Sequence, residues 1–186
     1  PAGANKIDNF ASYLSPGTTV NVTFLPGSDP MDTVAVAKRL HNEGMNAVPH
    51  LAARSLKDVD QIDSLLASYS AEAGVDEVLI IGGGVDQPVG AFDNSLQILE
   101  TGLLQKHGIR RVGVAGHPEG SPDISHIEIT EALSAKNALA KREGLKMYIE
   151  TQFCFEATIV LEWEKSVRAA GNELPIRIGI PGPATI

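Results

Sequence analysis

Short apolar runs alternate along the chain with longer segments whose apolar residues recur at helical spacing. The short runs predict buried strands, roughly thirty residues apart, over residues 20–24, 47–51, 77–81, 111–115, 148–153 and 177–180. The longer segments predict helices over residues 32–43, 57–70, 92–107, 127–142 and 159–169, and a first helix over residues 5–14. Glycines follow several of these helices and are expected to end them in the left-handed conformation, namely Gly44, Gly108, Gly144 and Gly171.

This alternation predicts an α/β fold with a parallel sheet and right-handed crossovers. Two architectures fit it, an open doubly wound sheet and a (β/α)8 TIM barrel. Open sheets that bind dinucleotides carry G-x-G-x-x-G after the first strand, a spacing that is absent here. The triplet Gly82-Gly83-Gly84 is followed by Val85-Asp86-Gln87-Pro88, a loop and not a helix start. Because a complete barrel takes about 250 residues, the barrel prediction makes this chain an incomplete TIM barrel of about six parallel strands.

Length and composition predict one globular domain over residues 1–186. The chain has 186 residues, of which 43% are hydrophobic and 20% charged, enough to bury a sizeable core. The composition of residues 1–4 predicts the end of a loop, and that of residues 181–186 predicts a turn between a strand and a helix. We therefore expect a piece of a longer polypeptide, a partial barrel that lacks the first strand and the last unit or units.

Charge and cysteine content limit the partners and the compartment. The formal net charge is -8 and no dense run of Lys or Arg occurs, so a nucleic-acid partner is not expected. The sequence has no apolar stretch of about eighteen residues and no export signal, which argues against a membrane. The single cysteine, Cys154, cannot form an internal disulfide and is expected to be a small buried side chain. These features favour the cytoplasm, and a homo-oligomer is left open.

Polar residues gather after the predicted strands, at the edge where parallel α/β proteins bind ligands. The most informative groups are residues 115–123, directly after the fourth strand, and residues 151–156, at the end of the fifth. Carboxyl ends of parallel strands meet at one edge of a sheet. We therefore expect the polar strand tips to converge on one cavity, formed by Thr23, His50, Ala115, His117 and Gln152.

Five motifs occur in order at successive strand tips over nearly the whole chain. They are Val22-Thr23-Phe24, Pro49-His50-Leu51, His117-Pro118-Glu119 with Pro122, Thr151-Gln152-Phe153-Cys154-Phe155-Glu156, and the Pro-Ile-x-Ile-Gly-Ile-Pro-Gly ending from Pro175. Together they resemble the methylenetetrahydrofolate reductase family. The resemblance implies a (β/α)8 barrel of which this chain supplies strands two to seven. It also implies an oxidoreductase that reduces 5,10-methylenetetrahydrofolate to 5-methyltetrahydrofolate, with electrons from NADH or NADPH passing through bound FAD.

The resemblance also assigns roles to residues. Gln152 matches the glutamine that hydrogen-bonds the folate pterin, and its amide offers the donor and the acceptor that such a contact needs. Phe153 and Phe155 match the apolar wall of that site. Flavin-binding positions are matched by Thr23, His50, Gly82, Gly83, Gly84, Ala115, His117, Lys136 and Asn137. The family often has tyrosine where His117 stands.

The chain departs from the family pattern in two places. The family's Arg-Gly-Asp after the third barrel strand, whose carboxylate lies between flavin and folate, is replaced by Gly82-Gly83-Gly84. Asp86, two residues further on, is the expected substitute and, with Gln152, the expected catalytic residue. The family's first strand also carries a glutamate that acts as general acid, because opening the folate ring requires protonation of the leaving nitrogen. This chain begins just after that place, so alone it should be poor at the full reaction.

Two other functions stay open. A non-catalytic folate- or flavin-binding subunit of the same fold would account for the lost Arg-Gly-Asp. A cobalamin- or pterin-dependent methyltransferase barrel shares the architecture, but no D-x-H-x-x-G and no cysteine pair occur in the sequence.

Overall fold

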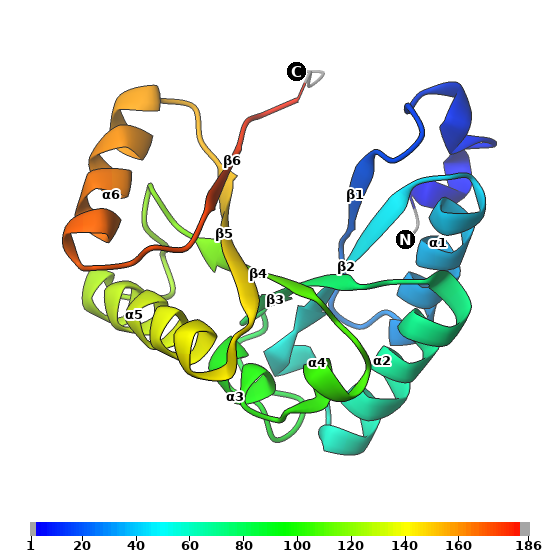
Figure 1. Ribbon diagram of the computed structural model, residues 1–186, viewed down its shortest axis with the longest axis horizontal. Coiled ribbons are helices and arrows are strands. Elements are labelled where there is room, and N and C mark those ends of the chain that lie inside the picture. Colours follow the sequence, from blue (N-terminus) through cyan, green and yellow to red (C-terminus); the bar gives the residue numbers. More distant parts are fainter. Residues whose placement is uncertain (1–2, 183–186) are drawn as a thin grey trace. The chain divides into compact units, whose positions relative to one another are not determined.

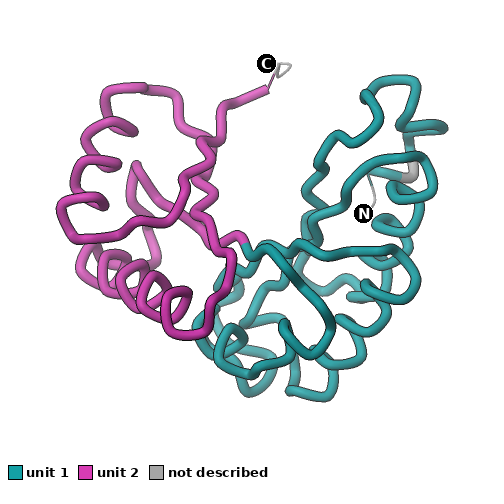
Figure 2. The backbone as a smooth tube through the Cα atoms, viewed as in Figure 1, with its two compact units in different colours: residues 1–112 teal, residues 113–186 magenta. Residues whose placement is uncertain are grey.

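The computed structural model describes residues 3–182, which divide into two compact units with the boundary between residues 112 and 113 (Figure 2). The predictions for residues 1–2 and for the turn over residues 183–186 lie outside the described residues. That the chain forms a single domain over residues 1–186 stays a prediction. None of the helices described is long and apolar enough to cross a membrane.

Unit 1 alternates strands with helices (Figure 1). Its elements are β1 (Thr19–Val22), α1 (Pro30–Asn42), β2 (Asn46–Ala52), α2 (Val59–Ala73), β3 (Glu77–Ile81), α3 (Ser95–Leu99) and α4 (Leu103–Lys106), with the 3-10 turns η1 (Ala4–Lys6), η2 (Phe10–Ser12) and η3 (Ala53–Ser55). β1 pairs with β2, and β2 with β3, both in parallel. Helix α1 packs on β2 and against α2, and its apolar side chains Val34, Ala37 and Leu40 are buried.

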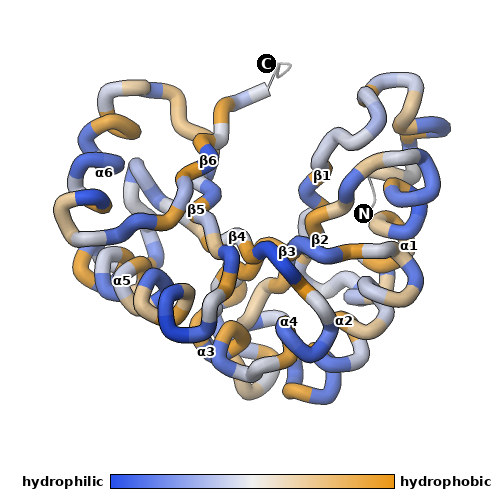
Figure 3. The backbone as a smooth tube through the Cα atoms, in the orientation of Figure 1, coloured by the Kyte–Doolittle hydropathy of each residue, from blue (hydrophilic) through white to orange (hydrophobic). Residues whose placement is uncertain are grey.

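Unit 2 continues the same alternation. β4 (Arg111–Gly116) begins in the last residues of unit 1, and α5 (His126–Glu143), β5 (Lys146–Phe153), α6 (Ala157–Ala169) and β6 (Ile176–Gly179) follow. β5 pairs with β6 in parallel, and α5 packs on β5. Figure 3 shows hydrophobic and hydrophilic residues alternating along α5 and α6, as expected for helices with one buried face.

The strand order identifies the fold class. In the described part of the chain, the strands follow one another in sequence order, β1-β2-β3-β4-β5-β6. A doubly wound sheet reverses its order at a switch point, whereas barrel strands succeed one another without reversal. The order therefore confirms the prediction of an α/β fold that forms part of a (β/α)8 barrel.

Two predicted helices differ from the structure. Residues 5–14 form the separate turns η1 and η2, because the side chain of Asn9 accepts a hydrogen bond from the backbone N–H of Ala11 and starts a new turn there. The helix predicted over residues 92–107 is divided into α3 and α4. Gly102 lies between them with φ +74°, a conformation that cannot continue a helix. The predicted helix-ending glycines all adopt positive φ, namely Gly44, Gly108, Gly144 and Gly171.

Each unit has its own apolar core. Unit 1 buries Leu40, Ile62, Leu66, Ile80 and Leu104 completely. In unit 2 the core includes Leu139, Ile149 and Trp163. Each such side chain contributes about 1.5–3 kcal/mol when removed from water, which holds the strands in place and leaves their tips to carry polar groups.

Candidate functional site

The polar residues of unit 1 lie where the sequence places them. Thr23 is exposed and follows directly on β1, and His50 lies two residues before the end of β2. The triplet Gly82-Gly83-Gly84 follows β3, and Asp86 lies exposed in the same loop. The structure therefore confirms that these residues belong to the carboxyl ends of β1, β2 and β3, whereas their roles toward a ligand stay predictions.

His50 is the most unusual of these side chains. It is mostly buried, and its Nε2 atom has no hydrogen-bond partner in the described part of the chain. Burial lowers the pKa of His50 from 6.5 to about 4, so the imidazole is neutral near pH 7. A buried polar atom without a partner costs about 1–3 kcal/mol, and a ligand that hydrogen-bonds to Nε2 would remove this cost.

In unit 2 a buried lysine lies on α5 beside the tip of β4. Lys136 is only 7% exposed, and burial lowers its pKa to about 8. His117, the first residue after β4, is half-buried and interacts electrostatically with Lys136. Burial and the nearby ammonium charge both lower the pKa of His117. The pair therefore presents a neutral imidazole next to a cation, a combination suited to an anionic or polar ligand.

Two other predicted flavin-binding residues of unit 2 differ in their surroundings. Ala115 is half-buried in β4, two residues before His117. Asn137 is buried on α5, where its Nδ2 donates to the carbonyl of Gly171 at 3.2 Å and its Oδ1 accepts from the N–H of Glu173 at 3.3 Å. The Asn137 amide thus holds the connection between α6 and β6, and its flavin contact stays a prediction.

Gln152 lies at a β-bulge. Along β5 the paired residues advance from Glu150 to Phe153 while the partners on β6 advance only from Arg177 to Gly179. β5 therefore has one residue more than β6 in this interval, and the extra residue bends the strand locally. Bulges of this kind are common beside functional sites. Gln152 is exposed at this bulge.

The bulge is fixed by its neighbours on both strands. The backbone N–H of Gly179 donates to Oγ1 of the buried Thr151 at 2.9 Å, and the N–H of Cys154 donates to the carbonyl of Gly179 at 3.1 Å. A Cβ atom at position 179 would lie 2.8 Å from the carbonyl oxygen of Thr151. Only glycine therefore allows β6 to approach the bulge this closely.

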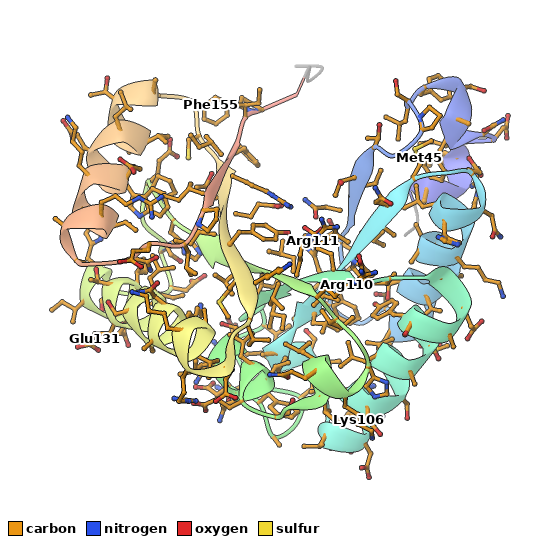
Figure 4. The ribbon with its side chains drawn as sticks, in the orientation of Figure 1. Met45, Lys106, Arg110, Arg111, Glu131 and Phe155 are labelled. Atoms are coloured by element: carbon orange, nitrogen blue, oxygen red, sulfur yellow. The ribbon has the colours of Figure 1, made fainter. Side chains whose placement is uncertain are left out.

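Two aromatic side chains extend the tip of β5. Phe153 is 60% exposed and Phe155 is 73% exposed, and their rings meet edge to face with centroids 5.7 Å apart. Phe155, labelled in Figure 4, is held through its backbone N–H, which donates to Oε1 of Glu119 at 3.4 Å. An exposed aromatic pair next to an exposed amide is suited to a flat heteroaromatic ligand that also carries hydrogen-bonding groups.

Sequence patterns did not reveal every residue that shapes these tips. The pairing of Thr151 with Gly179 depends on a register shift that periodicity does not show. Arg54, in η3 after β2, contacts the glycine-rich loop after β3. In the sequence, Arg54 stands out only as a cation directly after a strand, and cations in that position are common on protein surfaces.

Comparison with known proteins gives a family and a fold. A family model described as methylenetetrahydrofolate reductase matches residues 4–182. The crystal structure of dihydropyrimidinase from Brevibacillus agri matches with TM-score 0.52 at 11% identity, covering 88% of this chain and 38% of that chain. A crystal structure of D-hydantoinase gives TM-score 0.53 at 12% identity, covering 87% of this chain and 38% of that chain.

A D-hydantoinase from a Bacillus species gives TM-score 0.51 at 14% identity and covers 86% of this chain. The chain spans 38% of the length of each of these three solved structures. At such low identities the three similarities show a shared fold and carry no information about the reaction.

Proposed function

The chain belongs to the methylenetetrahydrofolate reductase family, and on this basis we propose that it is part of a flavin-dependent reductase of 5,10-methylenetetrahydrofolate. The proposed enzyme forms 5-methyltetrahydrofolate and takes its electrons from NADH or NADPH through FAD. The observation that carries the proposal is the match over residues 4–182 together with Gln152 exposed at the tip of β5. The proposal includes a cytoplasmic location, a folate substrate and no nucleic-acid or membrane partner.

The residues present fit a flavin. The buried Nε2 of His50 has no partner among the described residues and could form a hydrogen bond with a polar edge of the ligand. The buried ammonium of Lys136 suits a phosphate, because a cation that is largely withdrawn from water gains most from an anionic partner. A bound flavin would supply hydride transfer, which no protein side chain performs. The residues proposed to contact the flavin are Thr23 and His50 in unit 1 and, in unit 2, Ala115, His117 and Lys136.

The protein's own groups would act on the folate. The Gln152 amide can donate to and accept from the pterin at the same time, and its position on a fixed bulge limits its motion. Phe153 and Phe155 would cover the apolar face of the ligand. Asp86 would provide the carboxylate that the family places between the two ligands.

The proposal is tested with the full-length protein under anaerobic conditions. We expect a purified protein with the absorption bands of an oxidised flavin, released as FAD on denaturation. We also expect oxidation of NADH or NADPH that depends on added 5,10-methylenetetrahydrofolate and yields 5-methyltetrahydrofolate. Bound flavin and bound folate without any turnover would contradict the reductase and favour the non-catalytic subunit. A colourless protein that binds neither ligand would contradict both.

A further inference from the structure

The loop after β3 is tied at both ends to the segment after β2. The backbone N–H of Arg54 donates to the carbonyl of Gly82 at 2.9 Å, and the N–H of Val89 donates to the carbonyl of Arg54 at 2.8 Å. Two residues further on, the N–H of Ala91 donates to the carbonyl of Lys57 at 2.8 Å. The loop that carries Asp86 is therefore closed at its base by the backbone around Arg54.

Gly90 shows how closely the two segments approach. A Cβ atom built at Gly90 would lie 1.9 Å from the carbonyl oxygen of Lys57, a distance that no side chain allows. The base of the loop is thus packed backbone against backbone. Among the backbone hydrogen bonds described, none holds the residues between Gly82 and Val89. Three glycines in succession also give this stretch unusual conformational freedom.

The Arg54 side chain supplies the restraint inside the loop. Its Nη2 donates to the backbone carbonyl of Asp86 at 2.6 Å, and its Nε lies 3.7 Å from Oδ1 of Asp93. The side chain is 28% exposed, so most of it lies against the protein. One planar guanidinium therefore hydrogen-bonds the middle of the loop and lies within ion-pair distance of Asp93, two residues before α3, a geometry that a lysine ammonium does not reproduce.

We propose that Arg54 is a positioning residue that fixes the backbone at Asp86 and so directs the Asp86 carboxylate toward the reacting folate. This inference rests on the proposed reductase function. The physical basis is entropic: a glycine-rich loop without the guanidinium contact samples many conformations, and few of them present the carboxylate correctly. Arg54 acts through Asp86 and does not itself touch the substrate.

The test compares Arg54→Lys and Arg54→Ala with Arg110→Ala as matched control. Arg110 belongs to the same unit, is 76% exposed and pairs only with Asp76 among the contacts described. Hydrogen exchange of the amides of Val89 and Ala91, which are hydrogen-bonded at the base of the loop, reports loop order independently of any activity. We expect exchange to become about tenfold faster in both Arg54 variants and to stay unchanged in Arg110→Ala. Unchanged loop exchange in Arg54→Ala would overturn the inference.

Turnover separates positioning from a merely structural contribution. In the full-length enzyme, Arg54→Lys should lower kcat for folate reduction about three- to tenfold and leave the KM for NADH or NADPH unchanged. In an Asp86→Asn background, Arg54→Lys should have no further effect on kcat, because the two residues act in sequence. The positioning role would be overturned if the effects of Arg54→Lys and Asp86→Asn on kcat were fully additive. It would also be overturned if the loop loosened in Arg54→Lys while kcat stayed unchanged. If the protein proves not to be a reductase, the exchange measurement still decides whether Arg54 orders the loop.

Discussion

Gly179 and Thr151 are joined by a hydrogen bond from a backbone N–H to a side-chain hydroxyl, 2.9 Å long, where β5 contains one residue more than β6. In a regular parallel pair this N–H would bind a backbone carbonyl of the neighbouring strand. Here the Thr151 hydroxyl takes the place of that carbonyl, and the strand can bulge without leaving the N–H unsatisfied. Gln152, the next residue, is exposed within this bulge.

The hydroxyl of Thr151 should therefore matter for folate binding as well as for stability. Thr151→Val keeps the size of the side chain but leaves the half-buried N–H of Gly179 without its partner, at a cost of about 1 kcal/mol in the free energy of unfolding. We expect a raised KM for folate in Thr151→Val and nearly normal behaviour in Thr151→Ser, measured by steady-state kinetics and denaturant unfolding. Equal defects in both variants would show that the hydroxyl has no such role.

Burial of His50 predicts a specific dependence of stability on pH. The folded pKa of about 4 lies below the ordinary value of 6.5, so between these values the unfolded chain binds the extra proton. The contribution of His50 to stability is intact above pH 6.5 and is lost as pH falls. The loss reaches about 3 kcal/mol at pH 4, because each pKa unit is worth about 1.4 kcal/mol.

Denaturant unfolding between pH 7 and pH 4 measures this loss. His50→Gln should remove it from the pH profile, whereas substitution of the exposed His126 by Gln should leave the profile as in the wild type. Parallel profiles for the wild type and His50→Gln would contradict a buried neutral imidazole.

Lys136 should bind the flavin through its charge. Lys136→Met keeps an apolar stem in the buried site, so it should leave Tm unchanged or raise it, since a buried ammonium costs stability. Loss of a charge-assisted contact should weaken flavin binding by about 1.5–3 kcal/mol, roughly 10- to 150-fold. Fluorescence titration of the flavin-free protein measures the affinity. Lys141→Met, an exposed position on the same helix, is the control and should bind flavin normally.

The lowered pKa of Lys136 adds a pH signature. The folded pKa of about 8 lies below the ordinary 10.5, so stability gains as pH rises from about 8 to 10.5, because there the unfolded chain binds the extra proton. Flavin affinity should change in the opposite direction and fall above pH 8 as the ammonium becomes neutral. An affinity that is constant from pH 7 to pH 9.5 would contradict a contact between the Lys136 charge and the flavin.

Asp86 is expected to replace the carboxylate that the family carries in Arg-Gly-Asp. Asp86→Asn should slow folate reduction by more than about tenfold, the loss typical of one electrostatic or acid–base contact, while the fold stays intact. Circular dichroism checks the fold, and Asp123→Asn, in another exposed loop, serves as the comparison. A normal rate in Asp86→Asn would mean that this protein works without the family's acid.

The fold was predictable because its signals are local. Apolar runs gave β1 to β6 to within a few residues, and the alternation with helices gave the parallel order. The prediction of one helix over residues 5–14 was wrong, because the Asn9 side chain caps a new turn instead of continuing a helix. The bulge at Gln152 and the contact between Arg54 and Asp86 depend on residues far apart in the sequence, so no periodicity reveals them.

The central claim is that Gln152 recognises the pterin of a folate that exchanges electrons with a bound flavin. Its most direct test is the anaerobic reduction of that flavin by 5-methyltetrahydrofolate, followed by absorbance in the full-length wild type and in Gln152→Ala. Because Gln152 is exposed, its truncation should leave Tm unchanged, as in the control Gln105→Ala. We predict that Gln152→Ala lowers the efficiency of flavin reduction by 5-methyltetrahydrofolate about 5- to 150-fold, which corresponds to about 1–3 kcal/mol. Flavin reduction by NADH or NADPH should change little. Folate-driven reduction that survives in Gln152→Ala, while reduction by the nicotinamide collapses, would contradict the claim.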